Sequence, residues 1–294
     1  MKSKSKLANL KQLVRIRKPI LSSKKRRVSR ANTIYDLRAA AKKCTPRGPF
    51  DYTDGAADQE ITINKARRSF ENIEFQPHIL RDVSSATLAT TMLGKQYSMP
   101  VGIAPTGFTR MMNSEGEIAG SGAASAFGIP FTLSTMGTTS IENVAKNAPN
   151  GSNYFQLYLW RDRDRSLELI QRAEKAGYDG LVLTVDAQVA GARLRDVRNG
   201  LTVPPTLTAA TFLNALPRPN WWWNFLTKEP LDFASLGSWN GTVAQLMDTM
   251  FDPSMTYEDL KWIREIWPKK LIVKGVQRVD DAVKCAEYGA DAIV

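Results

Sequence analysis

The stretch GLVLTVD at residues 180–186 decides the fold of this 294-residue chain. It is a short apolar run, rich in Leu and Val, that ends in polar residues, as expected of one buried strand. The stretches NYFQLY at 153–158 and KLIVKG at 270–275 have the same form, and a helical pattern follows each of them. A (β/α) barrel builds its active site from polar groups collected at the carboxyl ends of parallel strands.

The alternation of strand and helix patterns runs through the chain from residue 99 onward. Such an alternation indicates a parallel sheet with right-handed crossovers. The predicted strands are 99–105, 130–135, 153–158, 180–186, 270–275 and 290–294, and the predicted helices are 114–127, 140–147, 162–176, 256–267 and 279–288. A further helix is predicted at 33–43, with Thr33 as its cap.

A doubly wound sheet is the rival architecture. It usually carries a glycine-rich nucleotide turn after its first strand, but that turn reads IAPTGFTR here and no phosphate-loop motif occurs. The sequence therefore predicts an α/β fold of the (β/α)8 TIM-barrel type. We expect one domain over 31–294, with the barrel at 99–294 and a long insertion at 187–255. About six of the eight strands are expected within these residues.

Residues 1–30 form a basic tail. They hold 12 of the 40 basic residues and no acid, so the rest of the chain has 28 basic and 29 acidic residues. The net charge of +11 therefore belongs to the tail and does not indicate a nucleic-acid-binding face. We expect a disordered tail. Leu7, Leu10 and Val14 at helical spacing suggest a segment that touches anionic lipid instead, and a mitochondrial transit peptide is a third interpretation.

The composition is that of a globular protein with a sizeable core. It is 43% hydrophobic, and no run of about 18 apolar residues indicates a membrane span. Cys44 and Cys285 lie far apart, which favours a reducing compartment over a disulfide framework. We therefore expect a cytoplasmic protein, and a peripheral position at the inner membrane is the alternative. His78 is the only histidine, so a zinc-type centre is improbable.

The insertion contains the aromatic run Trp221-Trp222-Trp223. Loops of this length are usually functional lids or lack fixed structure. A satellite cluster beneath the loop is the plainer interpretation of the tryptophans. A patch that docks an electron acceptor or faces a membrane is the alternative.

The polar groups at the predicted strand ends form a hydrogen-bonding set without a nucleophile and base. A Ser–His–Asp triad is disfavoured because His78 lies in the lead-in segment, far from Ser134 in sequence. Lys274 inside an apolar strand should face an anionic partner, since a bare lysine is costly to bury. A flavin site, a Schiff-base aldolase and a sugar-phosphate site all remain open on this chemistry. The set is Thr106, Ser134, Gln156, Tyr158, Thr184, Arg193 and Lys274.

Six stretches in series narrow these alternatives. They are YTDGAADQE, SMPVGIAPTGF, GEIAGSGAASAFGIPFTLSTMGTTSIE, FQLYLWRDR, LTVDAQVAGARLRD and LIVKGV, and they cover most of residues 31–294. With them the chain resembles the FMN-dependent L-2-hydroxy acid dehydrogenases and oxidases, the family of flavin L-lactate dehydrogenase, glycolate oxidase and mandelate dehydrogenase. The match looks closest to bacterial flavin L-lactate dehydrogenases.

The resemblance implies a role for each strand-end residue. Tyr52, Tyr158, Arg193 and Lys274 match the catalytic positions, which contact the substrate carboxylate and hydroxyl or, for Lys274, the N1–C2 carbonyl edge of the flavin. The FMN-binding positions are Thr106, Gly107, Ser134, Gln156, Thr184 and Lys274. The implied reaction oxidises an L-2-hydroxy acid, L-lactate above all, and passes the electrons to a quinone, a cytochrome or oxygen. Family members are often homotetramers.

The resemblance also shows a departure. In the family, a segment like SNHGGRQLD follows DAIV and carries the active-site histidine, whereas DAIV are the last residues here. We therefore expect a truncated chain whose turnover is weak or absent. The alternative is a flavin-binding fragment without catalysis, or the product of an interrupted gene.

Overall fold

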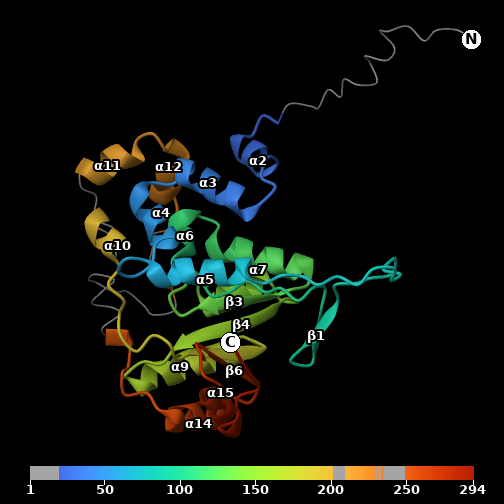
Figure 1. Cartoon of the computed structure of the whole chain (residues 1–294). Helices are drawn as coiled ribbons and strands as arrows, with labels where there is room; N and C mark the ends of the chain where they lie inside the picture. Colours follow the sequence, from blue (N-terminus) through green and yellow to red (C-terminus); the bar gives the residue numbers. More distant parts are fainter. Residues whose placement is uncertain (1–19, 201–208, 230, 232, 235–248) are drawn as a thin grey trace, which may run out of the picture. The chain divides into compact units, whose positions relative to one another are not determined.

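The computed structural model describes residues 20–200, 209–229, 231, 233–234 and 249–294 (Figure 1). They fall into two compact units divided between Cys44 and Thr45. The helical spacing predicted around Leu7, Leu10 and Val14 lies outside the described residues. Among those residues, no helix is both long and apolar enough to cross a membrane.

The N-terminal unit contains α2 (Ser23–Val28) and α3 (Ile34–Cys44). The predicted cap of α3 is confirmed, because Thr33 Oγ1 accepts a hydrogen bond from the backbone N–H of Asp36 (3.2 Å). The Asp36 carboxylate accepts in return from the backbone N–H groups of Asn32 and Thr33. These bonds lower the pKa of Asp36, since they favour the charged carboxylate.

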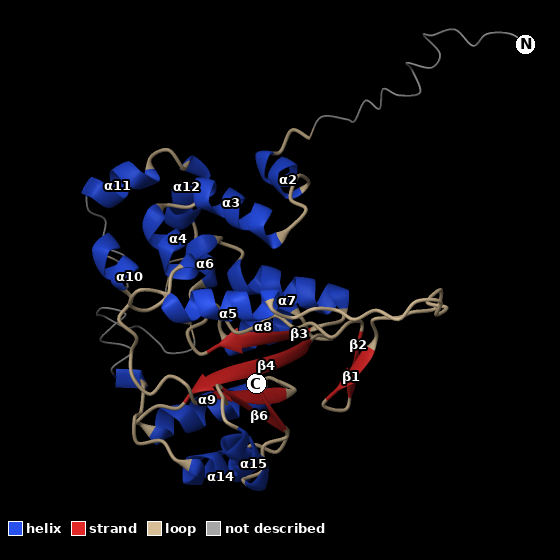
Figure 2. Cartoon of the chain, viewed as in Figure 1, coloured by secondary structure: helices blue, strands red, loops and turns tan. Residues whose placement is uncertain are grey.

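A five-stranded parallel sheet organises the second unit (Figure 2). Its strands lie side by side in their order along the chain, as neighbouring strands of a (β/α) barrel do. They are β3 (Pro130–Ser134), β4 (Ser152–Tyr158), β5 (Gly180–Thr184), β6 (Lys270–Lys274) and β7 (Ala292–Ile293). Five of the six predicted strands are therefore present, although β7 is shorter than predicted.

The remaining prediction, a strand at 99–105, is wrong as to its length. Only Ile103 pairs with β3, opposite Phe131, through two backbone hydrogen bonds. Pro100 and Pro105 flank this residue and have no backbone N–H to donate, which limits the ladder to one bridge. The segment nevertheless lies beside β3, where the first strand of the barrel was expected.

Helices between the strands cover one face of the sheet. They are α7 (Gly116–Phe127), α8 (Ile141–Asn147), α9 (Arg163–Lys175), α14 (Tyr257–Ile266) and α15 (Val279–Glu287), each close to its predicted range. Leu133, Phe155 and Leu181 project from the strands into the core on this face, where Ile170 and Ile263 meet them from the helices. Because strand side chains alternate, the residues between them line the opposite face.

The second unit also has short helices outside this repeat. Before β3 come α4 (Arg47–Asp54), α5 (Ile61–Glu71) and α6 (Thr109–Met112). The expected insertion after β5 is partly helical in the described residues, with α10 (Leu194–Asn199), α11 (Ala209–Ala215) and α12 (Pro219–Thr227). Pro219 occupies the first turn of α12, where a missing backbone N–H costs nothing.

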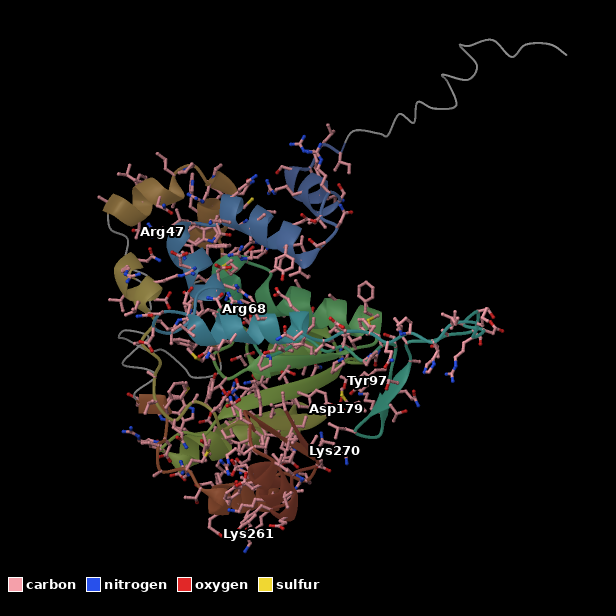
Figure 3. The ribbon with its side chains drawn as sticks, in the orientation of Figure 1. Arg47, Arg68, Tyr97, Asp179, Lys261 and Lys270 are labelled. Atoms are coloured by element: carbon pink, nitrogen blue, oxygen red, sulfur yellow. The ribbon has the colours of Figure 1, made fainter. Side chains whose placement is uncertain are left out.

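A hairpin of β1 (Thr90–Met92) and β2 (Lys95–Tyr97) is tied to the amino-terminal end of the sheet. The Tyr97 hydroxyl lies 2.8 Å from Ser152 Oγ and 3.0 Å from the Tyr154 hydroxyl, and all three groups are buried. Lys95 Nζ donates to Asp179 Oδ2 (2.7 Å). Figure 3 shows Tyr97 and Asp179 at this end of the sheet.

We expect Tyr97→Phe to lower the free energy of unfolding by about 1–2 kcal/mol, because it removes one member of a buried hydroxyl network and takes this partner from the Tyr154 hydroxyl, while Ser152 Oγ keeps its bond to Asp179. Urea unfolding followed by circular dichroism measures the change. Tyr35→Phe is the matched control, since Tyr35 is exposed on α3. Equal losses in the two variants would contradict the proposed contribution of the network.

Candidate active site

Three neighbouring strands end in a row of hydrogen-bonded polar side chains. Ser134 Oγ at the end of β3 donates to Gln156 Oε1 (3.2 Å), and Gln156 Nε2 donates to Thr184 Oγ1 (3.0 Å). All three side chains are buried. Ser134 pairs with Gln156 in the sheet register, so their side chains share one face. The bonds orient the Gln156 amide, whose oxygen faces β3 and whose nitrogen faces β5.

Lys274 continues this row on β6. It pairs in register with Thr184, and its Nζ lies 3.7 Å from Asp186 Oδ2. Its side chain is one-third exposed, so the ammonium group reaches the open end of the sheet. Asp186 was not predicted as a site residue, although it ends the stretch GLVLTVD that decided the fold. Its carboxylate supplies the anionic partner that a lysine at the end of a buried strand needs.

Thr135 holds the ends of β3 and β4 together. Its buried hydroxyl donates to the backbone oxygen of Gln156 (2.6 Å) and accepts from the backbone N–H of Tyr158 (3.1 Å). Its own backbone N–H donates to Gln156 Oε1 (3.3 Å). Thr135 was not predicted as a site residue. Its position directly after Ser134 was the only signal, and a threonine there is common in any turn.

Tyr52 and Arg193 form a second group. The Arg193 guanidinium lies over the Tyr52 ring, 4.8 Å from its centroid, and donates to the backbone oxygen of Tyr52 and to Asp196. Burial raises the pKa of Tyr52 to about 12, against the opposing influence of the Arg193 charge. The phenol therefore stays protonated and remains a hydrogen-bond donor at physiological pH.

The turn at Thr106 and Gly107 lies between these two groups. A Cβ added to Gly107 would lie 3.0 Å from Met136 Cβ, which is a tight contact, and 3.6 Å from the Tyr52 hydroxyl, which is an ordinary one. The backbone N–H of Met136 donates to Ser134 Oγ (3.1 Å), which places the turn beside the end of β3. Thr106 itself is exposed, and its hydroxyl reaches the backbone oxygen of Ala104 at 3.4 Å.

Tyr158 completes the set from the end of β4. It pairs in register with Thr184, and its ring packs edge-on against Phe251 at 5.1 Å. Burial raises the pKa of Tyr158, and the nearby Asp186 carboxylate raises it further. The structure thus brings together Ser134, Gln156, Thr184 and Lys274 through the sheet register, with Tyr158 beside them. The second group adjoins this row through Met136, which bonds Ser134 and lies against Gly107, and Gly107 in turn lies beside the Tyr52 hydroxyl.

A parallel α/β sheet with uncharged hydrogen-bonding groups and one lysine at its carboxyl end defines a barrel-type site suited to a polar heteroaromatic ring. Comparison with known proteins makes the class definite. The family model of the FMN-dependent dehydrogenases matches residues 41–294, and the chain belongs to this family. The (β/α)8 TIM-barrel fold and the FMN cofactor predicted from the sequence are confirmed with it.

Curated and solved relatives agree with this assignment. A putative L-lactate dehydrogenase of Mycobacterium tuberculosis is 52% identical over 97% of this chain and 69% of its own length. An L-lactate dehydrogenase of Ectopseudomonas mendocina is 38% identical over 88% of this chain and 70% of its own length. The crystal structure of the monotopic membrane protein (S)-mandelate dehydrogenase matches with a TM-score of 0.84 and 34% identity, over 90% of this chain and 71% of that one.

The strand-end residues fit an FMN ring. Ser134, Gln156 and Thr184 offer neutral donors and acceptors in a buried row, as the polar edge of a flavin requires. Lys274 adds a cation at the end of this row, where negative charge on a reduced ring would be stabilised. The close packing at Gly107 leaves a backbone surface without a side chain. Within the described part of the chain, no cluster of His, Cys, Asp or Glu is placed to hold a metal ion.

Thr135→Val is expected to weaken FMN binding about tenfold. The substitution keeps the shape of the side chain but removes the hydroxyl that fixes Gln156 and the backbone of Tyr158, at a cost of about 1–2 kcal/mol. Flavin fluorescence quenching during titration of the protein with FMN measures the dissociation constant. Thr135→Ser keeps the hydroxyl and serves as the control. Equal affinities for the Val and Ser variants would show that the hydroxyl does not position the site.

Proposed function

We propose that this protein oxidises an L-2-hydroxy acid to the 2-oxo acid with FMN, and that L-lactate is its substrate. The observation that carries the proposal is the buried row Ser134–Gln156–Thr184 with Lys274 at its end. The family model supports the cofactor, since it describes FMN-dependent dehydrogenases. The names of two curated relatives, a putative L-lactate dehydrogenase and an L-lactate dehydrogenase, support L-lactate as the substrate.

Each side chain then has a defined task. FMN, when bound, would supply the acceptor for the hydride from the substrate α-carbon, and the proton of the substrate hydroxyl would be released to water. The flavin ring would be held and oriented by Ser134, Gln156 and Thr184 and by the turn at Thr106 and Gly107. Lys274 would stabilise negative charge on the ring, and the Asp186 carboxylate, 3.7 Å from its Nζ, helps to hold the lysine side chain in place.

The substrate lies against the second group. The Tyr52 phenol remains a donor because burial keeps its pKa at about 12. Tyr158 offers a second phenol of raised pKa, and Arg193 supplies a guanidinium. Two donors and one cation suit the carboxylate and hydroxyl of a 2-hydroxy acid. Met136, which lies against Gly107, and Ala190, three residues before Arg193, are proposed to shape the pocket for the side chain of the 2-hydroxy acid.

The test is the visible spectrum of the purified protein with FMN, recorded without oxygen before and after addition of L-lactate. We expect a bound-flavin band that bleaches slowly with L-lactate and persists with D-lactate. Lys274→Met should slow the bleaching by about 10²–10³-fold, because the cation stabilises charge that develops in the transition state. Lys261→Met is the matched control, since Lys261 lies on the exposed side of α14 (Figure 3).

A band that does not bleach with L-lactate or any other L-2-hydroxy acid would overturn the proposal and favour the alternative of a flavin-binding protein without turnover. Equal rates for the Lys274→Met and Lys261→Met variants would overturn the role of Lys274.

We also propose that α11 and α12 face a lipid surface. Five apolar side chains here are between 54% and 65% exposed: Phe212 and Leu213 on α11, Leu216 just after it, and Trp223 and Leu226 on α12. Trp221 instead packs inward, stacking on Phe225 and donating to the backbone oxygen of Met111 (2.8 Å). The three tryptophans therefore divide between the two interpretations of the insertion.

Two observations favour lipid over another occupant. The mandelate dehydrogenase that matches in structure is a monotopic membrane protein. Lys228, which is exposed directly after α12, suits an anionic headgroup. A protein held at this surface has access to a membrane quinone, which we therefore propose as the electron acceptor.

Sedimentation with vesicles of 70% phosphatidylcholine and 30% phosphatidylglycerol tests the lipid contact. Replacing Leu213, Leu216 and Trp223 by Ser should reduce the bound fraction at least fivefold, since three exposed apolar side chains are lost. Phe70→Ser with Phe75→Ser is the control, because both residues are exposed elsewhere. Binding that is lost on deletion of residues 1–19, and unaffected by the triple replacement, would assign the lipid contact to the tail instead.

A further inference from the structure

Arg195 ties α10 to the segment that carries Tyr52. It lies on the first turn of α10, two residues beyond Arg193. One of its guanidinium nitrogens lies 3.2 Å from Asp54 Oδ2 and 3.7 Å from Asp51 Oδ1, and the other is hydrogen-bonded to Glu60 Oε2. Three carboxylates from α4 and the following turn thus converge on one cation.

The acidic side of this contact is built to receive a cation. The side chains of Asp51, Asp54 and Glu60 are 9–18% exposed, so their charges are only partly screened by water. Glu60 has a left-handed backbone with φ of 60°, and its Oε1 accepts from the backbone N–H of Ala56 (3.1 Å). Without the guanidinium, three like charges would face one another across the turn.

The backbone is joined at the same place. The N–H of Asp58 donates to the backbone oxygen of Ala192 (2.8 Å), and Asn199 Nδ2 donates to Asp51 Oδ2 (2.8 Å). A Cβ on Gly55 would lie 3.0 Å from Arg195 Cδ, so glycine permits the close approach. The two segments are therefore held by ion pairs, side-chain hydrogen bonds and one backbone bond.

Tyr52 and Arg193 lie inside this contact. Tyr52 stands between Asp51 and Asp54 on α4, and Arg193 precedes Arg195 by two residues. Their stacking and the bond from Arg193 to the Tyr52 oxygen depend on α10 keeping its place against α4. Arg193 is also held by Asp196, but that pair lies within its own segment and cannot set its distance to Tyr52.

We propose that Arg195 is a positioning residue: through Asp54 and Glu60 it locks Arg193 onto Tyr52, so that the two present one preformed binding surface to the substrate carboxylate. This inference rests on the proposed function for the identity of the substrate. The lock between the two segments does not depend on which reaction the protein catalyses. Loss of the lock should weaken substrate binding and leave the chemistry at Lys274 nearly unchanged.

The kinetic test compares Arg195→Gln and Arg195→Lys with the unchanged protein in the oxidation of L-lactate. We expect Arg195→Gln to raise KM about tenfold with kcat changed less than twofold, since uniform binding is lost. Arg195→Lys should recover part of the affinity. Glu60→Gln should act like Arg195→Gln, and the double variant should be no worse than Arg195→Gln, because both remove the same contact. Arg198→Gln is the matched control on the exposed side of α10.

Hydrogen exchange provides the readout that needs neither FMN nor substrate. The Asp58 amide should exchange at least tenfold faster in Arg195→Gln than in Arg198→Gln, with equal thermal midpoints for the two variants. Faster exchange with an unchanged KM would overturn the positioning role, and unchanged exchange would overturn the lock. Faster exchange in a protein that oxidises no L-2-hydroxy acid would support the lock and count against the proposed function.

Discussion

The register of the parallel sheet is the constraint on which the site depends. Gln156 pairs with Ser134, and Thr184 pairs with both Tyr158 and Lys274. In-register partners on parallel strands point to the same face, and every second residue of a strand returns to that face. A slip of one residue on β4 would send Gln156 and Tyr158 into the helix-covered core and bring Phe155 and Leu157 to the site. The apolar residues that bury the sheet therefore also fix the site.

Register places the side chains but does not orient them. Thr135 orients the side chains at the end of β4, because its hydroxyl is hydrogen-bonded to the backbone oxygen of Gln156 and to the backbone N–H of Tyr158. Arg195 does so on the other side, through its contacts to Asp54 and Glu60. Both act on the backbone or on charges next to the residues that meet the ligands. A shift of about 1 Å in such a residue is enough to affect catalysis, so these supports are part of the site.

The strand-end residues could be predicted from the sequence because the signal is local. An apolar run that stops at a polar side chain predicts both a strand and the position of its carboxyl end. Thr184 and Lys274 are the last residues of β5 and β6. Thr135 and Arg195 could not be predicted this way. Arg195 contacts Glu60, which lies 135 residues away, and the residues around Arg195 do not indicate which acidic side chain it pairs with. The strand predicted at 99–105 is wrong for a local reason. Its apolar pattern predicts a strand, but Pro100 and Pro105 have no backbone N–H to donate to a ladder.

The two ends of the sheet are stabilised differently, and the difference separates stability from function. At the amino-terminal end, Asp291 accepts from the Leu271 N–H and pairs with Lys270 and Arg264. Burial opposes its charge, yet these partners lower its pKa, so this contribution to stability is present above the unfolded pKa and is lost as pH falls through the folded value. At the carboxyl end, Lys274 has one carboxylate 3.7 Å away and is one-third exposed. Lys274 is therefore less tightly paired than Lys270 and Arg264, and its ammonium group can also interact with a ligand. The shorter ion pairs that hold the strands together lie at the amino-terminal end of the sheet.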